Sequence, residues 1–153
     1  MTALDQLNDD YRDLLSSFCE EGVEFVIVGA YALAFHGVPR ATGDIDLFVR
    51  PSVENAAKVM RALLAFGAPL DAAGVAEQNF SSPGIVFQIG LPPRRVDILT
   101  AIDGLEFDEA WASRVSADMN GSSVHFIGRE ALIVNKRSAG RAKDLADVER
   151  LEG

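Results

Sequence analysis

The segment from Val23 to Val49 constrains the fold of this chain more than any other. An apolar run rich in β-branched residues stops at Gly29, and an alanine- and leucine-rich run follows it as far as Phe35. This order of residues predicts a strand, a tight turn and a helix. A second strand-like run, Asp44 to Val49, closes the segment. The segment therefore predicts a strand–helix–strand unit.

Two carboxylates occupy the start of the second strand-like run. Side chains alternate between the two faces of a strand, so Asp44 and Asp46 project from one face while Ile45 and Leu47 project from the other. Paired carboxylates repel each other unless a cation lies between them, and hard divalent cations such as Mg²⁺ prefer carboxylate oxygen. Backbone N–H groups at the start of the helix after Gly29 suit a phosphate. The sequence predicts a metal site and a phosphate site in one unit.

A third carboxylate stands alone in a later apolar run. Asp97 lies within Arg95 to Leu99, and a hairpin-length connection separates that run from another at Ile85 to Ile89. The two runs are therefore expected to be antiparallel neighbours. Asp97 either caps the turn after its strand or serves as a third carboxylate of the metal site.

These motifs resemble the signature of the DNA polymerase β-type nucleotidyltransferase superfamily. A strand ending in Gly29-Ala30 precedes a spacer of thirteen residues, Tyr31 to Gly43, and then Asp-Ile-Asp-Leu. The superfamily has Gly-Gly or Gly-Ser at the first position, so Ala30 removes a possible hydroxyl contact but keeps the backbone N–H groups. The Val-Asp-Ile-Leu run around Asp97 is similar to the strand that carries the superfamily's third acid.

The resemblance implies an α/β (α+β) fold with a small mixed sheet flanked by helices. It implies transfer of a nucleoside monophosphate from a nucleoside triphosphate to a hydroxyl acceptor, assisted by two Mg²⁺ ions or by Mn²⁺. The acceptor is a small molecule, a protein side chain or an RNA end. The resemblance assigns catalysis and metal binding to Asp44, Asp46 and Asp97, and phosphate binding to Gly29 and Ala30.

Four basic residues lie close together in an otherwise acidic chain. They fall within eight residues, Lys136 to Lys143, while the formal net charge of the chain is −9. A solvated helix face is one explanation. The segment is also similar to the Lys-x-x-Ala-x-Arg-x-Lys-Asp segment of small bacterial nucleotidyltransferases, including those of type IV toxin–antitoxin systems. That resemblance assigns Lys136, Arg141 and Lys143 to nucleotide phosphates, and Asp144 to orienting a basic neighbour.

The loop before the acids and the two histidines have alternative interpretations. Arg40 and Thr42 belong either to a solvated loop or to the mouth of the site, where a guanidinium suits a triphosphate oxygen. His36 is either a structural residue at the end of its helix or a group that lines the site. His125 is assigned a structural role.

Composition limits the class of protein. The 153 residues, of which 48% are apolar, fit one domain spanning residues 1–153. The single cysteine, Cys19, excludes an internal disulfide and a cysteine zinc cluster. The acidic N-terminus does not resemble a secretory signal, and no apolar run approaches the roughly 20 residues of a membrane span. A cytoplasmic protein without a membrane segment is expected.

Two other functions remain open on the sequence. The first is a non-catalytic nucleotide-binding or toxin–antitoxin partner subunit with the same fold, and the second is a metal-dependent phosphohydrolase that uses the same acids. Substrate binding in so short a chain is expected to involve a partner subunit or a homo-oligomer. The acidic composition argues against broad nucleic-acid binding, so a small molecule or a protein is favoured as acceptor over an RNA end.

The remaining apolar periodicity predicts further elements along the chain. Helices are expected over Leu4–Phe18, Val53–Phe66 with Ser52 as N-cap, Ala131–Arg137 and Lys143–Leu151. Asp71–Ser82 is expected to hold a short helix and a loop, Asp103–Arg114 either a short helix or a lid-like loop, and Val124–Ile127 a short strand.

Overall fold

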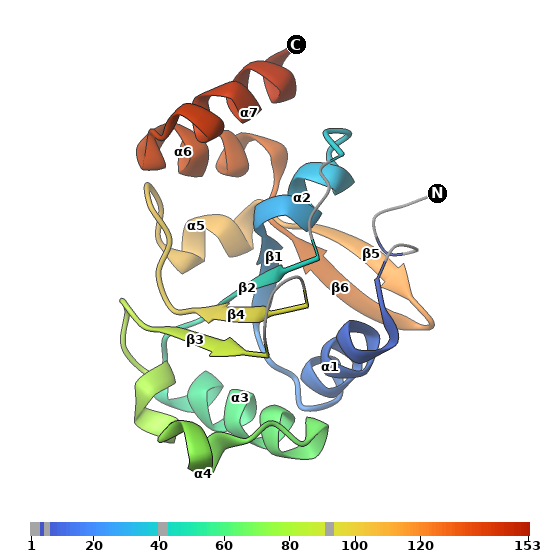
Figure 1. Ribbon diagram of the computed structural model, residues 1–153, viewed down its shortest axis with the longest axis vertical. Helices are drawn as coiled ribbons and strands as arrows, with labels where there is room; N and C mark the ends of the chain where they lie inside the picture. Colours follow the sequence, from blue (N-terminus) through green and yellow to red (C-terminus); the bar gives the residue numbers. More distant parts are fainter. Residues whose placement is uncertain (1–3, 5–6, 40–42, 91–93) are drawn as a thin grey trace.

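A six-stranded mixed sheet runs through the middle of the molecule in the computed structural model, with helices on both sides of it (Figure 1). The structure describes residue 4 and residues 7–39, 43–90 and 94–153. The strands are β1 (Phe25–Val28), β2 (Ile45–Val49), β3 (Val86–Ile89), β4 (Val96–Leu99), β5 (Val115–Met119) and β6 (Ser122–Phe126). This architecture confirms the predicted α/β class with a mixed sheet flanked by helices.

The helices lie in three groups around the sheet. In Figure 1, α1 and α3 lie below the sheet with α4, α2 and α5 lie above it, and α6 and α7 lie side by side at the far end. Their bounds are α1 (Asp9–Glu20), α2 (Gly29–Phe35), α3 (Val53–Phe66), α4 (Leu70–Ala73), α5 (Phe107–Ala112), α6 (Arg129–Ala139) and α7 (Ala142–Glu152), with a 3₁₀ helix η2 (Glu77–Phe80).

The strand order is β3-β4-β2-β1-β6-β5. β1 and β2 are antiparallel, β2 and β4 are parallel, and β3 and β4 form the predicted antiparallel hairpin. β6 is parallel to β1 and antiparallel to β5. All four residues of β1 are buried, which is expected of a central strand with helices on both faces.

Helix α1 is anchored to α3 below the sheet. The apolar stripe of α1, from Tyr11 to Phe18, is buried, and Ser17 Oγ donates a hydrogen bond of 2.7 Å to the carbonyl of Ala62 on α3. Full burial of each large side chain in this stripe contributes about 1.5–3 kcal/mol. Helix α1 thereby closes one face of the core.

Three element predictions differ from the structure. Helix α1 begins at Asp9 rather than Leu4, because the Asn8 side chain accepts a hydrogen bond from the N–H of Tyr11 and caps the helix there. Helix α6 extends beyond Ala131–Arg137 at both ends and stops at Gly140, whose φ of +68° ends the helix. Strand β5 was not predicted: Val115, Ala117 and Met119 alternate with polar residues, but the run is short and only Met119 is buried.

Candidate active site

The topology brings the acidic residues to one edge of the sheet. β2 and β4 run parallel, and their register places Asp46 directly beside Asp97 near the start of each strand. β1 runs antiparallel to β2 with Val28 opposite Asp46, so the chain leaves β1 at Gly29 at that same edge. Asp44, Asp46 and Asp97 therefore gather where α2 begins. We call these three residues the acid edge.

Gly29 lies in contact with the carboxylate of Asp46. Its φ is +68°, in the left-handed region that favours glycine. A Cβ added at this position would lie 2.1 Å from Asp46 Oδ2 and 3.0 Å from its Cγ, closer than real Cβ contacts allow. The side chain of Asp46 thus fills the space that the absence of a Cβ leaves at the turn between β1 and α2.

Asp46 and Asp97 interact strongly. Burial, the charge of Asp97 and a hydrogen bond with the Asp97 side chain raise the pKa of Asp46 to about 7, although Arg95 acts in the opposite direction. Near neutral pH the two carboxyl groups therefore share a proton for part of the time.

Arg95 is the cation of the acid edge, and the sequence analysis did not assign it a role. Its Nε lies 2.7 Å from Asp97 Oδ1 and its Nη2 lies 3.1 Å from Asp97 Oδ2. The same Nη2 is 3.7 Å from Asp44 Oδ2, and the backbone N–H of Arg95 donates to Asp44 Oδ1 at 2.9 Å. The signal was present in the sequence, because residues two apart in a strand share a face.

Tyr11 connects helix α1 to the acid edge, although the sequence analysis gave that helix no chemistry. Its hydroxyl donates to the carbonyl of Gly43, the residue before Asp44, and lies 3.1 Å from the carbonyl of Arg95. Burial, followed by the charges of neighbouring acidic groups, raises the pKa of Tyr11, so the phenol stays a hydrogen-bond donor at physiological pH. No local sequence pattern links position 11 to these carbonyls.

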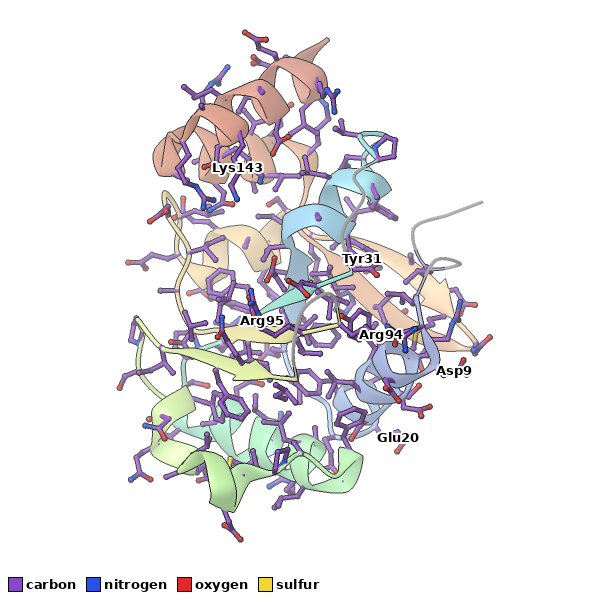
Figure 2. All side chains as sticks on the ribbon, in the orientation of Figure 1. Asp9, Glu20, Tyr31, Arg94, Arg95 and Lys143 are labelled. Atoms are coloured by element: carbon purple, nitrogen blue, oxygen red, sulfur yellow. The ribbon has the colours of Figure 1, made fainter. Side chains whose placement is uncertain are left out.

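A cavity of about 940 Å³ opens over the acid edge. The acid edge, Arg95 and Gly29 line one part of it, and the turn between α6 and α7 lines another. Figure 2 shows Arg95 on the strand side and Lys143 on the helix side. Apolar side chains complete the wall at Val86, Leu99, Ala101 and Ile102. The acidic and basic clusters, which are far apart in the sequence, therefore line the same cavity.

Lys136 lines that cavity and belongs to a buried ionic cluster. Its Nζ is 3.4 Å from Asp144 Oδ1 and 3.2 Å from Asp147 Oδ2, and all three side chains are nearly inaccessible to solvent. Burial opposes ionisation of Asp144, but the hydrogen bond from Arg141 and the charges of Lys136 and Arg141 hold its pKa below the usual value. The cluster joins α6 to α7.

Arg141 forms an ion pair, whereas Lys143 does not pair with any described residue. Arg141 Nε lies 2.6 Å from Asp144 Oδ2, so Asp144 orients two basic neighbours, as expected from the sequence. Lys143 also lines the cavity and is exposed. Within the described part of the chain, its ammonium group is in no ion pair.

Other candidate residues lie elsewhere or are not described. Arg40 and Thr42 lie outside the described residues, so their predicted role at the mouth of the site stays a prediction. The Nε2 atom of His36 is 2.7 Å from the carbonyl of Ile127, and His125 Nδ1 is 2.7 Å from Ser116 Oγ. Neither histidine lines the cavity.

The acid edge has the donor chemistry of a divalent-cation site. It offers carboxylate oxygen, the ligand that Mg²⁺ prefers, and Gly29 leaves room for Asp46 at the turn. As the side chains lie, the described residues contain no group of three acidic, histidine or cysteine side chains that could hold a metal ion. The guanidinium of Arg95 already holds both oxygens of Asp97, so ligation by all three acids requires that Arg95 move.

Comparison with known proteins agrees with this geometry. Residues 7–152 match the model of a family described as "Nucleotidyl transferase of unknown function (DUF2204)". A search of curated proteins finds no match. No described helix combines the length and the apolar character needed to cross a membrane.

Two solved structures share the fold. One is TM1012 from Thermotoga maritima, assigned as a nucleotidyltransferase, with a TM-score of 0.57 and 16% identity over 95% of this chain and 94% of that one. The other is ANT(2″)-Ia in complex with adenylyl-2″-tobramycin, with a TM-score of 0.56 and 19% identity over 92% of this chain and 84% of that one. At these identities the likeness concerns the fold.

Proposed function

This chain belongs to the family of nucleotidyl transferases of unknown function, and from that premise we propose a metal-dependent reaction for it. It would move a nucleoside monophosphate from a nucleoside triphosphate to a hydroxyl acceptor. The observation that supports this proposal is the convergence of Asp44, Asp46 and Asp97 on a cavity that is also lined by Lys143. Such a transfer needs carboxylates that bind divalent cations and a positively charged side chain that binds phosphate.

We assign the three acids to holding divalent cations, Mg²⁺ by preference and Mn²⁺ as an alternative. When bound, the cations would polarise the α-phosphate and lower the pKa of the attacking hydroxyl. Asp44 and Asp46 are assigned to both ions, and Asp97 to the ion on the acceptor side. Since Asp46 carries a proton for part of the time near its pKa of about 7, cation binding would release that proton.

The nucleotide would lie in the cavity with its phosphates between the two clusters. Backbone N–H groups at Gly29 and Ala30, both of which line the cavity, are assigned to phosphate oxygens. Lys143 is assigned to the leaving pyrophosphate, because it is exposed to the cavity and retains its charge for a ligand. Lys136 and Arg141 would act through Asp144, by holding the turn that presents Lys143.

The bond changes are those of an in-line displacement. The acceptor oxygen forms a bond to the α-phosphorus, the bond from that phosphorus to the α–β bridging oxygen breaks, and pyrophosphate leaves. The hydroxyl proton passes to a carboxylate oxygen at the acid edge or to solvent. The structural neighbour was solved with a nucleotide-modified small molecule, so hydroxylated small molecules are the first acceptors to test.

The test is calorimetric titration of ATP, CTP, GTP and UTP, each with Mg²⁺, into the wild type and into the Asp44→Asn/Asp46→Asn double variant. The proposal expects at least one triphosphate to bind the wild type and the double variant to lose that binding. Pyrophosphate release on addition of a hydroxyl acceptor then measures transfer. Equal binding by both proteins would show that Asp44 and Asp46 do not take part in nucleotide binding.

A second candidate is a non-catalytic nucleotide-binding or partner subunit with the same fold. The ion pair between Arg95 and Asp97 favours it, because a permanent pair would keep a cation off the acid edge. This candidate expects triphosphate to bind without Mg²⁺ and without release of pyrophosphate or phosphate. The same titration, repeated in EDTA, separates the two functions.

A further inference from the structure

Arg95 is the residue of the cavity whose role the proposed function leaves open. Its guanidinium engages both oxygens of Asp97, at 2.7 and 3.1 Å, and approaches Asp44 Oδ2 at 3.7 Å. One side chain thus spans two of the three carboxylates assigned to cations. A cation that reaches the acid edge therefore meets the Arg95 guanidinium there.

A divalent cation and this guanidinium exclude each other from Asp97. Mg²⁺ binds carboxylate oxygen at about 2.0–2.1 Å and would compete with the guanidinium for the same two oxygens of Asp97. Two positive groups a few Å apart also repel each other strongly in a partly buried site. The cation can therefore use Asp97 only after the guanidinium has left it.

The surroundings of Arg95 let its side chain move while its backbone stays in place. The Arg95 side chain is 27% exposed, compared with 12% for that of Asp97. Its backbone N–H is held by Asp44, and its carbonyl accepts a hydrogen bond from the N–H of Ile45. Because the residue lines the cavity, a released guanidinium would still face it. There it could hold phosphate oxygens in a bidentate manner.

We propose that Arg95 is a displaceable counter-ion that holds Asp44 and Asp97 until a divalent cation takes them, and that then turns to the triphosphate. The inference rests on the proposed function. It makes cation and triphosphate binding cooperative, because the cation releases the guanidinium that the phosphates need, and the phosphates keep that guanidinium away from the acids. Arg95 is thereby a positioning residue in the loading of the site.

The test is calorimetric titration of Mn²⁺ alone, without nucleotide, into the wild type, Arg95→Met, Arg95→Lys and Arg94→Gln. Arg94 is the matched control, since it is the adjacent exposed arginine and lies toward α1 rather than over the acid edge (Figure 2). Arg95→Met is expected to bind Mn²⁺ roughly five- to tenfold more tightly than the wild type, the scale of one partly exposed ion pair. Arg94→Gln should match the wild type.

Arg95→Lys separates displacement from a general effect of charge. Lysine keeps the charge but loses the bidentate hold on Asp97, so displacement expects an affinity between those of the wild type and Arg95→Met. A general charge effect expects Arg95→Lys to match the wild type, which would overturn the proposal.

A second readout follows the guanidinium itself. In ¹⁵N-correlated spectra, the arginine Nε–H signal that is missing from Arg95→Met should shift as diamagnetic Mg²⁺ is added. If wild type and Arg95→Met bind Mn²⁺ equally and this signal does not move, the role of Arg95 is overturned while the metal site stands. If none of the four proteins binds Mn²⁺, the metal site of the proposed function falls, and this inference falls with it.

Discussion

Asp46 and Asp97 face each other across the parallel pair of β2 and β4, and their side chains hydrogen-bond beside Gly29, whose missing Cβ leaves room for the Asp46 carboxylate. Burial, together with this contact, raises the pKa of Asp46 to about 7 from an ordinary value of 3.8. The folded protein therefore holds this proton more tightly than the unfolded chain does. The associated stability is complete below about pH 4 and is lost as the pH rises through about 7.

Asp46→Asn is expected to raise the Tm at about pH 8 in EDTA by about 2–4 °C, because the amide keeps a hydrogen bond to Asp97 without the buried charge. At about pH 4 and below, where Asp46 of the wild type is neutral in both the folded and the unfolded state, the two proteins should unfold at the same temperature. Thermal unfolding at both pH values checks this. An equal difference at the two pH values would contradict the assignment of the raised pKa to Asp46.

Gly29→Ala is expected to lower the free energy of unfolding by about 3 kcal/mol or more and to abolish cation binding, because the new Cβ displaces the Asp46 carboxylate. Gly37→Ala is the control. Gly37 also has a positive φ, +92°, but a Cβ there meets nothing within 4 Å, so this variant should lose about 1 kcal/mol and keep cation binding. Urea unfolding and Mn²⁺ titration of both variants separate backbone strain from the clash.

Lys136→Met is expected to destabilise the protein by about 3–5 kcal/mol, since it leaves Asp144 and Asp147 buried without their shared cation. Arg137→Met is the neighbouring control. Its ion pair with Glu152 is exposed on both sides, so the loss should stay below about 1 kcal/mol. Urea unfolding measures both, and similar losses would show that the buried cluster does not hold α6 against α7.

Lys143→Gln is expected to leave the unfolding midpoint unchanged and to weaken triphosphate binding roughly tenfold, because it removes an exposed charge that faces the cavity. Arg150→Gln removes a charge from the same helix at an exposed position outside the cavity lining. Calorimetry with the triphosphate that binds the wild type compares the two. Equal weakening by both changes would indicate a general effect of net charge.

Tyr11→Phe is expected to cost about 1 kcal/mol of stability and to weaken Mn²⁺ binding several-fold. The lost hydroxyl holds the carbonyl of Gly43, and with it the position of Asp44. Urea unfolding and Mn²⁺ titration check the two effects. Unchanged Mn²⁺ affinity would show that Asp44 is positioned without help from α1.

The local parts of the fold could be predicted from the sequence. The bounds of β1 and α3, with Ser52 as the cap of α3, follow from apolar periodicity and capping residues and were confirmed. β5 was missed although Val115, Ala117 and Met119 share one face, because so short an alternating run is a weak signal and most of this edge strand is exposed. Apolar periodicity marks the buried face of an element, and little of β5 is buried.

Some residues of the candidate site could likewise be predicted from the sequence, and others could not. The sequence motifs indicated the three acids, and the structure places them at one edge. Tyr11 was missed because its role depends on a contact with a residue 32 positions away, whereas the pairing of Arg95 with Asp97, two positions away on one strand face, was available in the sequence and was overlooked. Lys136 was assigned to phosphate by a resemblance, and that role stays a prediction; its ion pairs with Asp144 and Asp147 depend on how α6 and α7 pack, which the sequence does not reveal.

The parallel pairing of β2 and β4 also affects how the protein folds. Asp44 and Arg95 are 51 positions apart, and α3, α4, η2 and β3 lie between the two strands in the chain. Closing so long a loop costs entropy before the new contacts repay it, and such long-range pairings slow folding. Because the acid edge depends on this pairing, Mn²⁺ binding is expected to appear during refolding only when β2 and β4 align.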